Sequence, residues 1–112
     1  MTEKMQTYII ELRRGSLTLA VLGCLKEPRY GYALLQLMQA KGIAMEANTL
    51  YPLLRRLESQ GLLSSEWDIG ESRPRKYYRI SEEGRQLFTR LWREWIKMRQ
   101  CLEVICGEEG LI

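Results

Sequence analysis

The stretch that decides the fold spans residues 48–80 and reads NTLYPLLRRLESQGLLSSEWDIGESRPRKYYRI. Its first part repeats leucine at helical spacing, at Leu50, Leu53, Leu54 and Leu57, and Gly61 ends this pattern. Residues 62–69 and 76–80 are rich in the β-favouring types Trp, Tyr and Ile. Residues 70–74 between them have the Gly, Ser and Pro of a turn. The sequence therefore predicts an amphipathic helix followed directly by a β-hairpin.

The charge of this stretch is suited to DNA. The hairpin tip and second strand, residues 73–79, hold four cations, two aromatic side chains and no acid. One face of the helix is apolar and can be buried, whereas the other is polar and can reach base edges and phosphates. The alternating Tyr77 and Tyr78 place one ring in the core and one on the surface, and we expect Trp67 to pack within the hairpin. We predict DNA contacts from Asn48, Thr49, Tyr51, Arg55, Arg56, Arg73, Arg75, Lys76 and Tyr77.

Three further helices are predicted before this region. Apolar residues from Met5 to Leu12 indicate a first helix ending near residues 13–15, and Ser16 can cap a second helix over residues 17–25. A third helix covers residues 31–40, and residues 43–47 form a short turn into the Asn48 segment. These elements form a helix-turn-helix. In DNA-binding proteins with this arrangement, the second helix enters the major groove of DNA.

Pro52 conflicts with a regular helix at this position, because it lacks an N–H group and its ring crowds the carbonyl four residues earlier. Two starts are open: Asn48 can be the cap, or a kinked first turn can begin around Glu46.

A long C-terminal helix is predicted from Ser81, since Glu82 and Glu83 follow it near the positive end of the helix dipole. This helix can continue to about Cys106. A chain of 112 residues is close to the size at which burial through oligomerisation matters. The apolar spacing of four and three residues is that of a heptad seam, so we predict a homodimer with an interface of Leu91, Trp95, Met98, Leu102 and Ile105.

Aromatic residues of the same helix predict an effector site. A two-fold axis would pair Trp95 with its copy, and the pair could sandwich a flat aromatic molecule. Trp92 and Phe88 would widen the apolar wall, so the predicted ligand-binding residues are Phe88, Trp92 and Trp95. The alternative is that these rings only pack.

Composition excludes several other functions. The chain has no histidine and no grouped acidic pair, so we expect no catalytic site, no metal site and no cofactor. Its three cysteines lack CxxC spacing and are expected to be buried thiols. The longest apolar run, near residues 17–25, is too short to span a bilayer and no signal peptide is evident, which predicts a cytoplasmic protein without membrane contact.

Four separated motifs resemble the PadR family of bacterial transcriptional regulators. They are YGYAL at residues 30–34, TLYPLLRRLE at 49–58, GLL at 61–63 and RKYYRISEEG at 75–84, and the likeness extends over residues 14–95. The resemblance implies operator binding, usually repression relieved by a small molecule, and it adds Tyr30 to the expected DNA contacts. The short C-terminus is similar to the branch of the family that has a single C-terminal helix. Glu46 departs from the pattern, because many relatives have a Ser cap there.

The predicted fold is mainly α with a small β-hairpin: a winged helix-turn-helix in residues 1–80 and a dimerisation helix in residues 81–112. The predicted function is that of a homodimeric repressor that binds an inverted-repeat operator in double-stranded DNA and responds to a small aromatic or hydrophobic effector. The alternatives are a winged-helix module that binds a protein and no nucleic acid, and a ligand-binding protein whose DNA surface is vestigial. The acid-free stretch of residues 73–79 favours DNA, because a protein-docking wing has no need to match phosphates.

Overall fold

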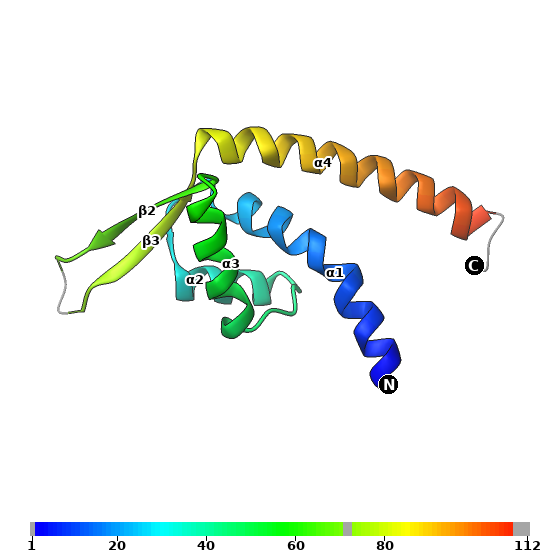
Figure 1. The fold of residues 1–112 in the computed structure, drawn as a ribbon, viewed down its shortest axis with the longest axis horizontal. Helices are drawn as coiled ribbons and strands as arrows, with labels where there is room; N and C mark the ends of the chain where they lie inside the picture. Colours follow the sequence, from blue (N-terminus) through cyan, green and yellow to red (C-terminus); the bar gives the residue numbers. More distant parts are fainter. Residues whose placement is uncertain (1, 71–72, 109–112) are drawn as a thin grey trace.

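A computed structural model describes residues 2–70 and 73–108 (Figure 1). The prediction of a mainly helical chain with a small sheet is confirmed. Residues 71–72 of the expected hairpin tip lie outside the described part, as do residues 109–112 of the expected C-terminal domain. The elements are α1 (Glu3–Cys24), β1 (Arg29–Tyr30), α2 (Gly31–Ala40), α3 (Ala47–Ser59), β2 (Leu63–Asp68), β3 (Arg75–Ile80), α4 (Glu82–Leu102) and a terminal π-helical turn, η1 (Glu103–Glu108).

The N-terminal region is one helix, so the prediction of two helices broken near Gly15 is wrong. The Thr2 side chain caps α1 by accepting a hydrogen bond from the Met5 amide. Gly15 lies within the helix, and its cost of about 1 kcal/mol relative to Ala is small beside the packing of the second half of α1. The Ser16 hydroxyl donates to the Arg13 carbonyl inside the helix and so caps no new one.

The helix α3 begins at Ala47 with Glu46 in the cap position, so the alternative of a start at Asn48 is wrong. The Glu46 side chain makes no capping hydrogen bond, while its carbonyl accepts from the Thr49 and Leu50 amides. Pro52 remains inside the helix with its ring exposed. Because Asn48 is exposed too, water can reach the Asn48 carbonyl that Pro52 leaves without a helical donor.

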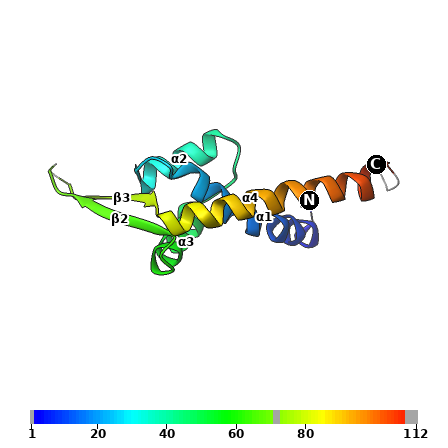
Figure 2. The same ribbon diagram turned by 90° about the horizontal axis from the view of Figure 1, so that it is seen from above.

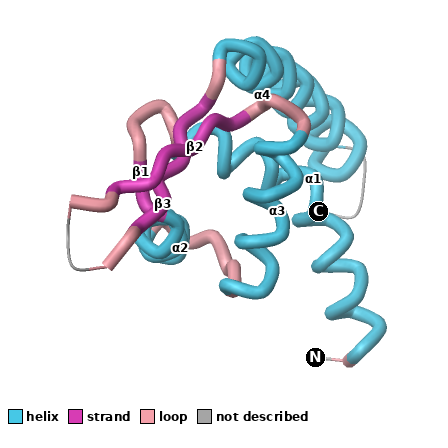
Figure 3. The backbone as a smooth tube through the Cα atoms, turned by 60° about the vertical axis from the view of Figure 1, so that its left-hand side comes forward, coloured by secondary structure: helices cyan, strands magenta, loops and turns pink. Residues whose placement is uncertain are grey.

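The sheet is antiparallel in the order β1-β3-β2, and Figure 3 shows its three strands side by side. The two predicted hairpin strands are confirmed, whereas the two-residue β1 was not expected. Tyr78 is 6% exposed and belongs to the core, as its alternation with Tyr77 predicted. Trp67 is 62% exposed, which contradicts its expected packing within the hairpin.

One hydrophobic core joins α1, α2, α3 and the sheet. The recurring leucines of α3 are buried, as predicted, and they meet the second half of α1, where Val21 and Leu22 are fully buried. Burial of this apolar face is the main source of stability for the domain. The core residues are Val21, Leu22, Leu25, Leu34, Leu35, Met38, Met45, Leu50, Leu53, Leu54, Leu57, Leu63, Tyr78 and Ile80.

The helix α4 begins as predicted, because the Ser81 side chain accepts a hydrogen bond from the Gly84 amide. Its far half and the N-terminal half of α1 extend away from the core and diverge (Figures 1 and 2). The radius of gyration is 16.5 Å, compared with about 13 Å for a compact chain of this length. These two arms are therefore a large surface that residues 2–70 and 73–108 do not cover by themselves.

Candidate nucleic-acid interface and apolar groove

The exposed side of α3 carries the predicted base-reading residues. Asn48 and Arg55 are exposed and almost two helical turns apart, so they share the stripe opposite the buried leucines. Thr49 and Arg56 lie on the flank that faces α1, and Thr49 lines a hollow there. Tyr51 lies on the other flank, toward the wing formed by β2 and β3.

Tyr51 is less available than its predicted role requires. It is half-buried against the core, and a β-carbon added to Gly31 would lie 2.6 Å from its Cε1 atom. The absence of a side chain at Gly31 therefore makes room for the Tyr51 ring. One ring edge still borders the hollow at the base of the wing.

That hollow has a volume of about 570 Å³ and brings together five of the predicted DNA-binding residues. Tyr51 enters it from α3, Arg73, Arg75 and Lys76 from the wing, and Tyr30 from β1. The first turn of α2 also borders it, and Tyr30 provides no side-chain cap there. Cations and aromatic rings around a hollow suit a sugar-phosphate backbone.

A stack of three side chains orders the cationic edge. The Tyr30 and Tyr77 rings are stacked with centroids 4.7 Å apart, and the Arg75 guanidinium lies 5.2 Å from the Tyr30 centroid. The Tyr30 hydroxyl donates to Asp68 Oδ2 at 2.8 Å. This hydrogen bond is the main cause that raises the pKa of Tyr30 to about 12 and lowers the pKa of Asp68. The stack holds Arg75 at the rim of the hollow, while Arg73 is exposed beside it.

Lys76 also borders the hollow, but its ammonium is paired within the domain. Its ammonium Nζ forms an ion pair with Glu58 Oε1 at 3.0 Å, with side-chain exposures of 27% and 31%. The Ser65 hydroxyl donates to the other Glu58 oxygen. The hydrogen bond from Ser65 and the bond from Lys76 lower the pKa of Glu58, and the bond to Glu58 raises the pKa of Lys76. The charge of Lys76, predicted to contact a phosphate, is thus paired with a carboxylate of the same domain.

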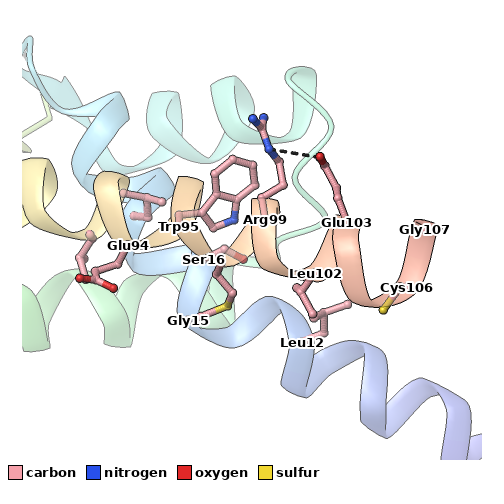
Figure 4. A pocket seen from close by; sticks show the side chains of 13 residues that line it. Leu12, Gly15, Ser16, Glu94, Trp95, Arg99, Leu102, Glu103, Cys106 and Gly107 are labelled. Carbon is pink, nitrogen blue, oxygen red and sulfur yellow. Dashed lines mark ion pairs between the residues drawn. The ribbon is translucent and has the colours of Figure 1, made fainter. Parts of the chain in front are cut away.

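A second site lies between the two arms. A groove of about 580 Å³ is lined mainly by apolar side chains of α1 and α4, and Figure 4 shows Leu102 and Cys106 near Leu12. Trp95, Met98 and Leu102 of the predicted seam line this groove. They are 38%, 60% and 46% exposed. The groove is lined by Leu12, Gly15, Ser16, Leu19, Leu91, Glu94, Trp95, Met98, Arg99, Leu102, Glu103, Cys106 and Gly107.

The other seam and ligand residues are distributed differently. Leu91 also lines the groove but packs partly against the core, and Ile105 is 64% exposed in η1. Trp92 is stacked on Trp95 with centroids 5.5 Å apart, next to the groove. Phe88 packs on α1, where a β-carbon at Gly23 would lie 3.1 Å from the ring. Phe88 is therefore part of the packing between α4 and the core.

Several partners in these sites were not predicted from the sequence. Glu58 on α3 holds Lys76 of the wing, Asp68 on β2 holds Tyr30 of β1, and Gly15, Ser16 and Leu19 line the groove from α1 beside Leu12. The helical spacing of the α1 residues was the available signal for the groove, whereas nothing local indicates the two acid contacts.

The cysteine prediction is correct for one residue of three. Cys24 is half-buried, and its burial raises the pKa of the thiol. Cys101 and Cys106 are exposed on the arm formed by the end of α4 and η1. Within residues 2–70 and 73–108, no helix is long and apolar enough to cross a membrane, and no group of three metal-binding side chains occurs.

Comparison with known proteins identifies the family. The model of the transcriptional regulator PadR-like family matches residues 19–90. The crystal structure of a PadR family transcriptional regulator from Eggerthella lenta DSM 2243 is similar, with 47% identity and a TM-score of 0.87 over 96% of each chain. A Streptococcus transcriptional regulator has 30% identity and a TM-score of 0.73 over 82% of this chain and 93% of that one. A transcriptional regulator of Mycobacterium tuberculosis is 40% identical over 60 residues, which are 54% of this chain and 56% of that protein. The predicted resemblance is thus confirmed, and the chain belongs to the PadR-like family of transcriptional regulators, which are DNA-binding proteins and not enzymes.

Proposed function

We propose that this regulator is a homodimeric repressor that binds an inverted-repeat operator and releases it when a small aromatic or hydrophobic ligand binds. The observation that carries the proposal is the hollow where α3 and the wing meet, because cations border it beside the exposed face of a recognition helix. In this proposal residues 1–80 bind DNA and residues 81–112 form the dimer.

Each part of the interface has a distinct task. Asn48 and Arg55, on the central stripe of α3, contact base edges in the major groove. Arg73 and Arg75 contact phosphates at the wing, where the stack with Tyr30 keeps Arg75 in position. Thr49, Arg56 and Tyr77 flank these contacts. Two copies related by a two-fold axis then read half-sites about 34 Å apart.

The exposed apolar arms support the homodimer. Met98 and Leu102 on α4, Ile105 on η1 and Leu12 on α1 are all more than 45% exposed, with Leu12 at 79%. An apolar surface of this kind is removed from water when another protein surface covers it. A second copy can do so by laying its α4 along the groove, which also completes the predicted heptad contacts.

The same groove supports the ligand proposal. Trp95 lines it and is backed by the stacked Trp92 ring. A symmetric partner would bring a second pair of rings to the axis, and flat apolar molecules bind well between such rings. Because the ligand would lie in the dimer interface, it can change the distance between the two recognition helices.

Capture of genomic DNA fragments by the purified protein, followed by sequencing, tests the DNA proposal. We expect an inverted repeat whose affinity falls steeply with salt, since the arginines displace counterions from phosphates. Binding without salt dependence, or no preference for any fragment, would refute the operator assignment and favour a protein-binding role for the wing.

Tryptophan fluorescence tests the ligand proposal. A panel of planar aromatic compounds is titrated into wild-type protein, into Trp95→Leu, and into wild-type protein saturated with operator DNA. We expect at least one compound to quench the wild-type signal, to lose affinity in the variant, and to bind more weakly with operator present, as reciprocal linkage requires. Equal affinity in all three samples would show that Trp95 only packs.

A further inference from the structure

The ion pair between Glu58 and Lys76 joins three elements that together form the DNA-binding surface. Glu58 lies near the end of α3, Lys76 on β3 and Ser65 on β2, and one carboxylate contacts both partners. The two wing strands pair along their whole length, from Leu63 with Ile80 to Asp68 with Arg75. A contact to both strands therefore fixes the wing as a unit relative to the recognition helix.

We propose that Glu58 is a positioning residue for operator recognition: it sets the place of the wing relative to α3 and holds the Lys76 charge away from the phosphate backbone. This proposal rests on the proposed DNA-binding function and changes the task expected of Lys76. Arg73 and Arg75 are then the phosphate-binding cations of the wing, and Lys76 serves the geometry of the domain.

The surroundings of Lys76 support this assignment. Its ammonium lies 5.2 Å from the Tyr78 ring centroid and 6.0 Å from that of Trp67. Two aromatic rings and a carboxylate thus surround the cation, which is only partly exposed to water. To bind a phosphate, the Lys76 ammonium would have to give up its carboxylate partner and its contacts with the two rings. Arg75 is exposed, and its contact with the Tyr30 ring holds its guanidinium at the rim of the hollow instead of inside the domain.

Glu58 also has a reason to stay ionised and in place. It accepts hydrogen bonds from a hydroxyl and an ammonium, and both favour the carboxylate form, which lowers the pKa of Glu58. Removal of its charge would leave Lys76 half-buried without a partner. The lysine side chain is long enough to turn outward toward solvent, where it adds a free cation to the wing.

The test compares the salt dependence of DNA affinity among single variants by fluorescence anisotropy, with an operator duplex and a duplex of unrelated sequence. Lys76→Met keeps the apolar stem between the two rings and removes the charge. We expect its salt slope to equal that of the wild type, whereas Arg75→Met, the matched control, lowers the slope by about 0.9 for one lost phosphate contact. An equal loss in both variants would overturn the proposal, since Lys76 would then be a phosphate ligand.

Glu58→Gln tests the other half of the proposal. The amide can still bond to Ser65, but Lys76 is released, so we expect the slope on unrelated DNA to rise by about 0.9 and the preference for the operator to fall. The exchange Glu58→Lys with Lys76→Glu restores the pair and should recover the preference, which a loss of general stability would not allow. If Glu58→Gln is folded by circular dichroism and matches the wild type in slope and preference, the positioning role is wrong.

These outcomes are separable from failure of the proposed function. Wild-type protein without salt-dependent DNA binding refutes DNA recognition itself, before any variant is compared. If Glu58→Gln does not fold, the comparison of Lys76→Met with Arg75→Met still decides where the lysine charge is used.

Discussion

Replacement of Leu102 by Asp should split the proposed dimer, because it puts a charge into the groove between the arms. Leu102 lines that groove and is 46% exposed in the single chain. The Arg99 side chain also lines the groove, but its Nε atom already pairs with Glu103 Oε1 at 3.4 Å. The new carboxylate would therefore have to share the Arg99 guanidinium with Glu103, whose charge already balances it.

The size of the effect follows from symmetry. One buried carboxylate without a partner costs several kcal/mol, taken here as about 3 kcal/mol. A two-fold dimer contains the substitution twice, which gives about 6 kcal/mol and a rise in the dimer dissociation constant of about ten-thousandfold. A nanomolar dimer would then dissociate at about ten micromolar. Operator affinity should fall in parallel, because two separate monomers lose the advantage of binding two linked half-sites.

Sedimentation equilibrium over a range of protein concentrations measures this shift, and anisotropy with operator DNA measures its consequence. Gln100→Asp is the matched control, since Gln100 is exposed and lies on the opposite side of α4 from the groove. We expect the control to stay dimeric. A Leu102→Asp protein that sediments as a dimer at submicromolar concentration would show that the interface lies elsewhere, and equal dissociation of both variants would show that charge alone, and not its place, breaks the dimer.

Three other outcomes can be measured directly. Gly84→Ala should lower the free energy of unfolding by about 1–3 kcal/mol in urea titrations, because the added methyl would meet the Leu62 carbonyl, whereas Gly107→Ala enters open space and should change little. The wild type should have a larger free energy of unfolding than Glu58→Gln at pH values above 4.5, the ordinary pKa of Glu. This difference should disappear as pH falls through the lowered pKa of Glu58 in the folded state, and unfolding titrations at pH 7 and pH 3 measure it. Tyr30→Phe removes the hydroxyl that bonds to Asp68, so the pKa of that carboxyl should rise in an NMR titration, and an unchanged value would contradict the hydrogen bond.

Local patterns made much of this fold predictable. The leucine repeat of α3 and the turn residues of the wing act within a few positions of one another, so the elements they predict are present. The Ser81 cap is equally local, since its partner is the Gly84 amide three residues on. Gly15 is also a local signal, but it led to the wrong prediction of a helix break. Its weak preference against the helix is outweighed by the packing of α1.

Contacts between distant parts of the chain could not be predicted in this way. Strand β1 has only two residues and exists through pairing of Arg29 with Tyr78 and Tyr30 with Tyr77. The ion pair that engages Lys76 joins residues 18 positions apart, and the Tyr30–Asp68 hydrogen bond joins residues 38 apart. A count of cations in the wing treats Lys76 and Arg75 as equal. Only the three-dimensional arrangement separates a lysine that pairs inside the domain from an arginine at its rim.

The junction of α4 with the wing limits how the proposed ligand in the groove could act on DNA binding. At this junction the Ser81 hydroxyl donates to the Gly61 carbonyl at 2.6 Å, and the Ser81 amide donates to the Leu62 carbonyl at 3.1 Å. Gly84 lies so close to the same Leu62 carbonyl that no side chain fits between them. Two hydrogen bonds and close backbone packing make this junction rigid. A displacement of α4 therefore moves α3 and the wing with it. In the proposed dimer, release of the operator should then occur by rotation of each whole protomer about an axis other than the two-fold, a rigid-body change of one protomer relative to the other. The ligand needs only to favour one angle between two α4 helices, and the distance between the recognition helices follows.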